Sequence, residues 1–164
     1  ALGLAQFLAG EPAAALATLD TGIRAAHGQD AQPIFVRALA QDSLGNAKAA
    51  LESYNLASRT ALARASDPAN TGEGRYYRGV WLFRQKDYDR AEAEFASALN
   101  SGVSPALRPD VTAWWRLMPV AKGECDGAAS YLRSSLEKVS GFFPRQEAEL
   151  MLDRCSKISA LHPQ

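Results

Sequence analysis

Residues 86–99 read Lys86-Asp87-Tyr88-Asp89-Arg90-Ala91-Glu92-Ala93-Glu94-Phe95-Ala96-Ser97-Ala98-Leu99, a turn followed by one amphipathic helix. A small residue lies five places after the turn residue, a large apolar residue nine places after it, and a small residue twelve places after it. Four segments share this spacing: Gly10, Ala15, Leu19 and Gly22; Gly45, Ala50, Tyr54 and Ala57; Lys86, Ala91, Phe95 and Ala98; Gly123, Ala128, Leu132 and Ser135. Self-similarity of this kind predicts a fold built from repeated units.

The residues ahead of each turn repeat as well. Seven places before it stand Gly3, Ala38, Gly79 and Arg116, and six places before it stand Leu4, Leu39, Val80 and Leu117. Small residues let two helix backbones approach, and large residues fill the holes between the helices. Each unit is therefore predicted to be two antiparallel helices joined by a tight turn, with the stacking of units burying their apolar stripes.

This pattern resembles the tetratricopeptide repeat (TPR) family, most clearly in Arg78-Gly79 followed by residues 86–99. The resemblance implies an all-α solenoid, a right-handed superhelix of stacked helix hairpins, as a single domain over residues 1–164. Its units would span residues 1–29, 30–64, 72–102 and 109–139, with a capping helix over 144–161. The turn-to-turn spacings of 35, 41 and 37 residues exceed the family period of about 34, and the surplus is expected in loops at 65–74 and 101–110.

Two positions in the fourth unit carry their own predictions. Asp110 follows Pro109 and is placed to cap the helix that contains Trp114 and Trp115. Pro119 lies inside the same helix, where it removes a hydrogen bond and is expected to kink or shorten the helix.

The resemblance also implies a binding face, because the first helices of TPR units line a concave groove that takes a peptide or a helix. The residues that register places there are Phe35, Leu39, Asp42, Tyr76, Val80, Phe83, Arg84 and Leu117. Apolar anchors on this face would bury side chains of a protein partner, with Asp42 and Arg84 fixing its direction. The alternative is that these aromatics are interhelical core.

Composition narrows the function classes. The 18 basic and 18 acidic side chains cancel without forming a basic block, so nucleic acid is not expected as a partner. No apolar run approaches the length of a membrane span. No catalytic or phosphate-binding motif is present, and His27 and His162 are too few for a histidine-rich metal site, so neither an enzyme nor a metal or other cofactor is expected.

The sequence therefore predicts a non-catalytic scaffold or adaptor that binds a protein or peptide, in a bacterial envelope assembly for example. Two alternatives stay open: a regulatory or accessory domain of a larger enzyme or envelope complex, and a carrier of an apolar small ligand.

Cys125 and Cys155 are the only cysteines, and they are either two free thiols or one disulfide. In the repeat register both lie at helix ends that point the same way, so a bond between them is geometrically reasonable. A disulfide would favour a periplasmic or otherwise extracytoplasmic location, and free thiols would favour the cytoplasm.

Overall fold

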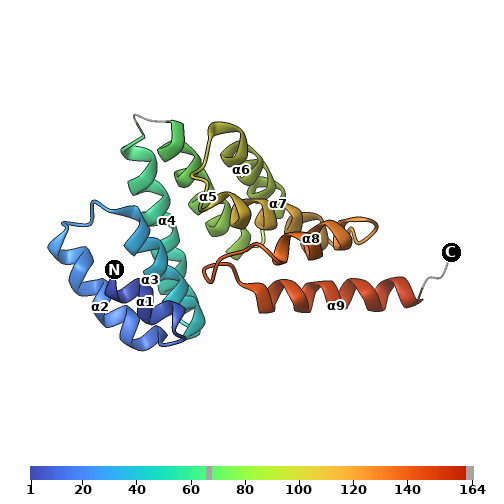
Figure 1. Ribbon diagram of the computed structural model, residues 1–164, viewed down its shortest axis with the longest axis horizontal. Coiled ribbons are helices and arrows are strands. Elements are labelled where there is room, and N and C mark those ends of the chain that lie inside the picture. The colour runs from blue at the N-terminus through green and yellow to red at the C-terminus, as the bar shows by residue number, and fades with distance from the viewer. Residues whose placement is uncertain (66–67, 162–164) are drawn as a thin grey trace.

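The computed structural model describes residues 1–65 and 68–161, and within this part of the chain the secondary structure is helical throughout (Figure 1). The helices are α1 (Leu2–Leu8), α2 (Pro12–Ala25), α3 (Ala31–Ser43), α4 (Ala47–Ala63), α5 (Pro68–Arg84), α6 (Tyr88–Ser101), α7 (Arg108–Lys122), α8 (Ala128–Leu136) and α9 (Arg145–Leu161). The predicted all-α class is confirmed. None of these described helices combines the length and the apolar character that a bilayer span needs.

Consecutive helices from α1 to α8 pack against each other, and short turns join them in pairs. All four predicted turn residues adopt a left-handed backbone, with φ of 80° at Gly10, 78° at Gly45, 64° at Lys86 and 86° at Gly123. Glycine reaches this region without steric cost because it has no Cβ. The predicted turn register is confirmed. In the third unit, Lys86 occupies the turn position that glycine occupies in the other three.

Replacing Lys86 with glycine should raise the free energy of unfolding by about 0.5–1 kcal/mol. The substitution removes the steric energy of a Cβ in the left-handed region, and this gain is larger than the entropic cost of fixing a glycine on folding. The reverse change at the matched position, Gly45→Lys, should lower the free energy of unfolding by a similar amount. Urea denaturation of both variants measures the two shifts, and a destabilised Lys86→Gly protein would contradict the argument.

The small and large residues of the repeat lie where the helices cross. Ala50 and Ala91 are buried, as are Tyr54 and Phe95. A Cβ on Gly79 would come within 2.5 Å of the Phe95 ring, so a side chain there would keep α5 and α6 apart.

The expected loop at residues 65–74 is wrong from Pro68 onward, and residues 66–67 lie outside the described part of the chain. Helix α5 begins at Pro68 and runs through most of that segment, so the surplus residues lengthen a helix. The glycines that suggested a loop allow close packing instead: a Cβ on Gly72 would overlap the carbonyl oxygen of Gly102, and one on Gly74 would lie 2.7 Å from Cγ of Leu62. The second expected connection does exist, between α6 and α7.

Gly72→Ala should lower the free energy of unfolding by about 1–3 kcal/mol, because the new methyl group meets backbone atoms that cannot rotate away. Gly22 provides the matched control, since it also lies inside a helix and a Cβ there meets nothing within 4 Å. Gly22→Ala should stabilise the protein by about 0.5–1 kcal/mol. Equal thermal melts for the two variants would refute the assigned packing.

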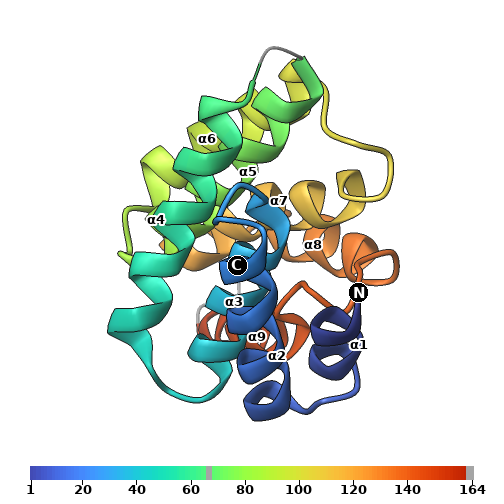
Figure 2. The same ribbon diagram turned by 90° about the vertical axis from the view of Figure 1, so that its left-hand side faces the viewer.

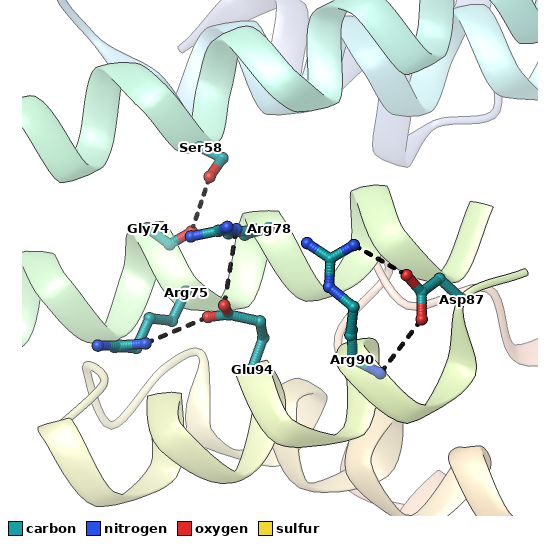
Figure 3. A network of polar contacts seen from close by, with 7 residues as sticks. All are labelled: Ser58, Gly74, Arg75, Arg78, Asp87, Arg90 and Glu94. Carbon is teal, nitrogen blue, oxygen red and sulfur yellow. Dashed lines mark hydrogen bonds and ion pairs between the residues drawn. The ribbon is translucent and has the colours of Figure 1, made fainter. Parts of the chain in front are cut away.

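Polar contacts cross between α4, α5 and α6 beside these close approaches (Figure 3). The Ser58 hydroxyl donates to the Gly74 carbonyl at 3.2 Å. Arg75 and Arg78 both pair with Glu94, at 3.3 and 3.6 Å. These ion pairs are partly exposed, so their contribution to stability is small and they mainly set the register of α5 against α6.

For α7, the predicted Asp110 cap and the predicted shortening at Pro119 are wrong, and the predicted kink stays a prediction. The helix begins at Arg108, so Asp110 lies inside the first turn and does not cap the helix. The Asp110 carboxylate instead accepts a hydrogen bond from the Ser140 N–H. Helix α7 also continues past Pro119 to Lys122 without ending there. Burial of Leu117, Met118 and Val120 around the proline holds the helix together despite the missing hydrogen bond.

Candidate functional site

The six apolar residues predicted to anchor a partner lie in the protein core. These residues are Phe35, Leu39, Tyr76, Val80, Phe83 and Leu117, and each is at most 5 % exposed. They pack on neighbouring side chains, as when the Phe35 ring stacks on Tyr77 at 4.3 Å. Their placement supports the core alternative, because a side chain enclosed by its own helices offers no surface to a partner.

A segment near the C-terminus packs against the first helices of several pairs. We call residues 140–147 the closing segment. The Phe142 ring stacks on Phe7 of α1 at 6.1 Å, and the Phe143 ring meets Trp114 of α7 edge-on at 5.2 Å. Figure 2 shows the chain ahead of α9 lying beside α1. The surface predicted to receive a partner is therefore covered in part by the chain itself.

Arg84 ties the closing segment to the helices beneath it. Its Nη1 donates to both carboxylate oxygens of Glu147, at 2.8 and 2.7 Å, and its Nε lies 2.8 Å from Asp42. Burial acts to lower the pKa of this guanidinium, but Tyr54, Glu147 and Asp42 raise it above its ordinary value. Arg84 and Asp42, predicted to orient a partner, are thus engaged within the chain.

Asp110 holds the start of the closing segment. One of its oxygens accepts the Ser140 N–H at 2.7 Å, and the other accepts the Ser140 hydroxyl at 2.5 Å. Burial raises the pKa of the Asp110 carboxyl, and the two hydrogen bonds from Ser140 offset only part of that rise. With both oxygens occupied, Asp110 serves as an anchor for the loop.

Three tyrosines in the core also have displaced pKa values. Burial raises the pKa of Tyr54, Tyr76 and Tyr77 above the usual value for a phenol. These side chains stay protonated at neutral pH, and their rings pack against Phe35. Their shifted pKa values accordingly reflect burial in the core.

A cavity of about 300 Å³ opens on another part of the surface, where α6, α7 and α8 meet. Its lining residues are Glu92, Trp115, Arg116, Pro119, Ala128 and Tyr131. Trp115 is 40 % exposed and Tyr131 is 64 % exposed, so two aromatic rings are accessible at this place. Exposed aromatic side chains around a hollow are typical of surfaces that bind other molecules.

The polar groups of the cavity are held on two sides. Arg116 lies over the Tyr131 ring at 5.8 Å, and its Nη1 donates to Ser135 Oγ at 2.6 Å and to the Tyr131 carbonyl at 3.2 Å. On the other side, Glu92 accepts from Lys122 at 2.8 Å, a hydrogen bond that raises the pKa of the lysine. The cavity thus has apolar walls with one cationic and one anionic edge.

Comparison of the chain with protein-family models, with curated proteins and with solved structures finds no match. Across the described residues, no three His, Cys, Asp or Glu side chains come together in a way that could hold a metal ion. His162 lies outside those residues.

Cys125 and Cys155 form a disulfide, with their sulfur atoms 2.02 Å apart and their Cα atoms 5.4 Å apart. Cys125 precedes α8, and Cys155 lies in α9, where it is 3 % exposed. The bond fastens α9 beside α8, and the hypothesis of a Cys125–Cys155 pair agrees with the structure.

None of the cavity residues belongs to the binding face that the repeat pattern predicts. One signal was available: Arg116 occupies the position that holds a small residue in the other three units. Its long side chain reaches α8 through Ser135 and the Tyr131 carbonyl, and so frames the cavity. Nothing in the sequence indicates that Trp115 and not Trp114 is exposed, because the two residues are adjacent and identical in type.

Proposed function

We propose that this chain is a non-catalytic protein-interaction module built from TPR-like hairpins, and that it binds a protein partner at the cavity between α6, α7 and α8. The observation that supports the site is the exposure of Trp115 and Tyr131 around that cavity. Tryptophan and tyrosine are enriched among the residues that carry binding energy at protein interfaces. The left-handed turns at the four predicted positions support the repeat family.

The concave groove is the less favourable place for this partner. Its apolar residues are enclosed, and Arg84 and Asp42 are already ion-paired. A partner that bound there would have to break the contacts of the closing segment first, at the expense of its own affinity.

The disulfide supports an extracytoplasmic location for the module. Disulfides persist in oxidising compartments such as the bacterial periplasm, and cytosolic thiols are kept reduced. An adaptor or accessory role in an envelope assembly would suit such a location.

Photo-crosslinking in the source cells tests the site. A photoreactive phenylalanine analogue placed at Tyr131 should crosslink a protein partner, and Trp115→Ala in the same chain should weaken that crosslink by at least about tenfold. The matched control is the same analogue at Leu56, which is 41 % exposed on α4, away from the cavity. Crosslinking at position 56 but not at 131 would refute the site.

A carrier of a small ligand is the second candidate, because the cavity volume of about 300 Å³ reaches the lower range of small-molecule sites. Native mass spectrometry of protein purified without denaturation separates the two functions. A bound small molecule that Trp115→Ala removes would favour the carrier.

A further inference from the structure

We infer that the cavity between α6, α7 and α8 binds an extended peptide segment that carries an acidic side chain next to a large apolar one. This inference rests on the proposed interaction function and adds the chemistry of the partner. It follows from three features: an apolar hollow, a cation that forms no ion pair with the described carboxylates, and a helix carbonyl that Pro119 leaves without its regular donor.

The hollow suits one large apolar side chain. Trp115, Pro119, Ala128 and Tyr131 supply apolar surface around a volume of about 300 Å³. Both rings are partly exposed, so a side chain that enters the hollow removes existing apolar surface from water.

Arg116 supplies the charge complementarity. Its guanidinium is held by Ser135 and by the Tyr131 carbonyl, and among the described residues it has no ion pair with a carboxylate. The nearby cation Lys122 differs, because Asp89, Glu92 and Glu124 lie within 3.8 Å of its Nζ. Arginine stays charged at all relevant pH values, and its remaining N–H groups suit an incoming carboxylate.

The third feature favours a peptide over a free organic acid. Pro119 has no N–H, so the carbonyl of Trp115, four residues earlier in α7, lacks its regular helical donor. Both residues line the cavity. A peptide brings backbone N–H donors that such a carbonyl can accept, whereas a free carboxylate brings none.

The test selects ligands without assuming a partner. A random peptide library displayed on phage is panned against the intact protein, and the enriched peptides are synthesised with acetylated and amidated ends, so that they have no terminal charge. We expect enriched peptides to place Asp or Glu within two residues of a large apolar residue. They should also shift the indole N–H resonance of Trp115 on binding.

Matched variants isolate the contribution of the carboxylate. Glu→Gln in a selected peptide should weaken binding by at least about fivefold, because a charge-assisted hydrogen bond to Arg116 is lost. Arg116→Gln in the protein should abolish that difference, with its fold checked by circular dichroism. Lys48→Gln is the control and should preserve the difference, since that lysine is exposed on α4 and does not line the cavity.

The outcomes separate this inference from the proposed function. Peptides that shift the Trp115 resonance equally well with Glu, Gln or Lys would overturn the acidic preference and leave the interaction site standing. Peptides that bind without moving the Trp115 resonance, or a library that yields no binder, would overturn both.

Discussion

Replacing Trp114 with alanine should lower the free energy of unfolding by about 3–5 kcal/mol, the largest effect expected of a single core side chain in this protein. Trp114 is 1 % exposed, and its ring contacts Phe83 at 4.7 Å, Phe95 at 5.6 Å and Phe143 at 5.2 Å. The truncation leaves a cavity under the closing segment and removes one of its anchors. Guanidinium denaturation followed by circular dichroism measures the loss.

The neighbouring tryptophan supplies the control for this experiment. Trp115 is 40 % exposed and lies about 100° around α7 from Trp114, so Trp115→Ala should change the free energy of unfolding by less than about 1 kcal/mol. The same substitution should nevertheless weaken partner binding. Equal destabilisation by the two changes would contradict the assignment of one tryptophan to the core and the other to the cavity.

Removing the disulfide through the double substitution Cys125→Ser and Cys155→Ser should lower the free energy of unfolding by about 3 kcal/mol. The bond closes a loop with a sequence separation of 30, and that constraint limits the unfolded chain. Denaturation of the wild-type and double-variant proteins with and without a reducing agent measures the effect.

The reducing agent provides an internal control for that prediction. It should bring the wild-type protein to the stability of the double variant and leave the double variant unchanged. Wild-type protein that keeps its stability under full reduction, as verified by thiol counting, would show that the bond contributes nothing.

Local patterns predicted the parts of the fold that depend on local chemistry. The turn at Gly45 requires a left-handed backbone and is followed by Ala50 and Tyr54 at helical spacing, so the sequence alone locates the turn and the buried face. The cysteine pair was accessible only in part, because the repeat register made a bond geometrically reasonable and left two free thiols as the alternative.

Features that depend on distant contacts were not predictable from such patterns. Nothing near Arg84 in the sequence indicates that its partner is Glu147, 63 residues later. Gly72 lies in a segment whose composition is typical of a loop. Only its close approach to the Gly102 carbonyl shows why the helix needs glycine at this position. The burial of the predicted anchor residues was unpredictable for the same reason, since the closing segment covers part of the surface that the repeat pattern leaves open.

The closing segment also changes how cooperatively the protein should unfold. In a stack with nearest-neighbour contacts alone, the end units can open independently of the middle. Here the stacking of Phe7 on Phe142 joins the first helix to the last part of the chain, and the Arg84–Glu147 pair joins the third hairpin to α9. Opening either end therefore breaks contacts at the other, so the terminal helices should exchange their amide hydrogens together with the centre of the protein and not ahead of it.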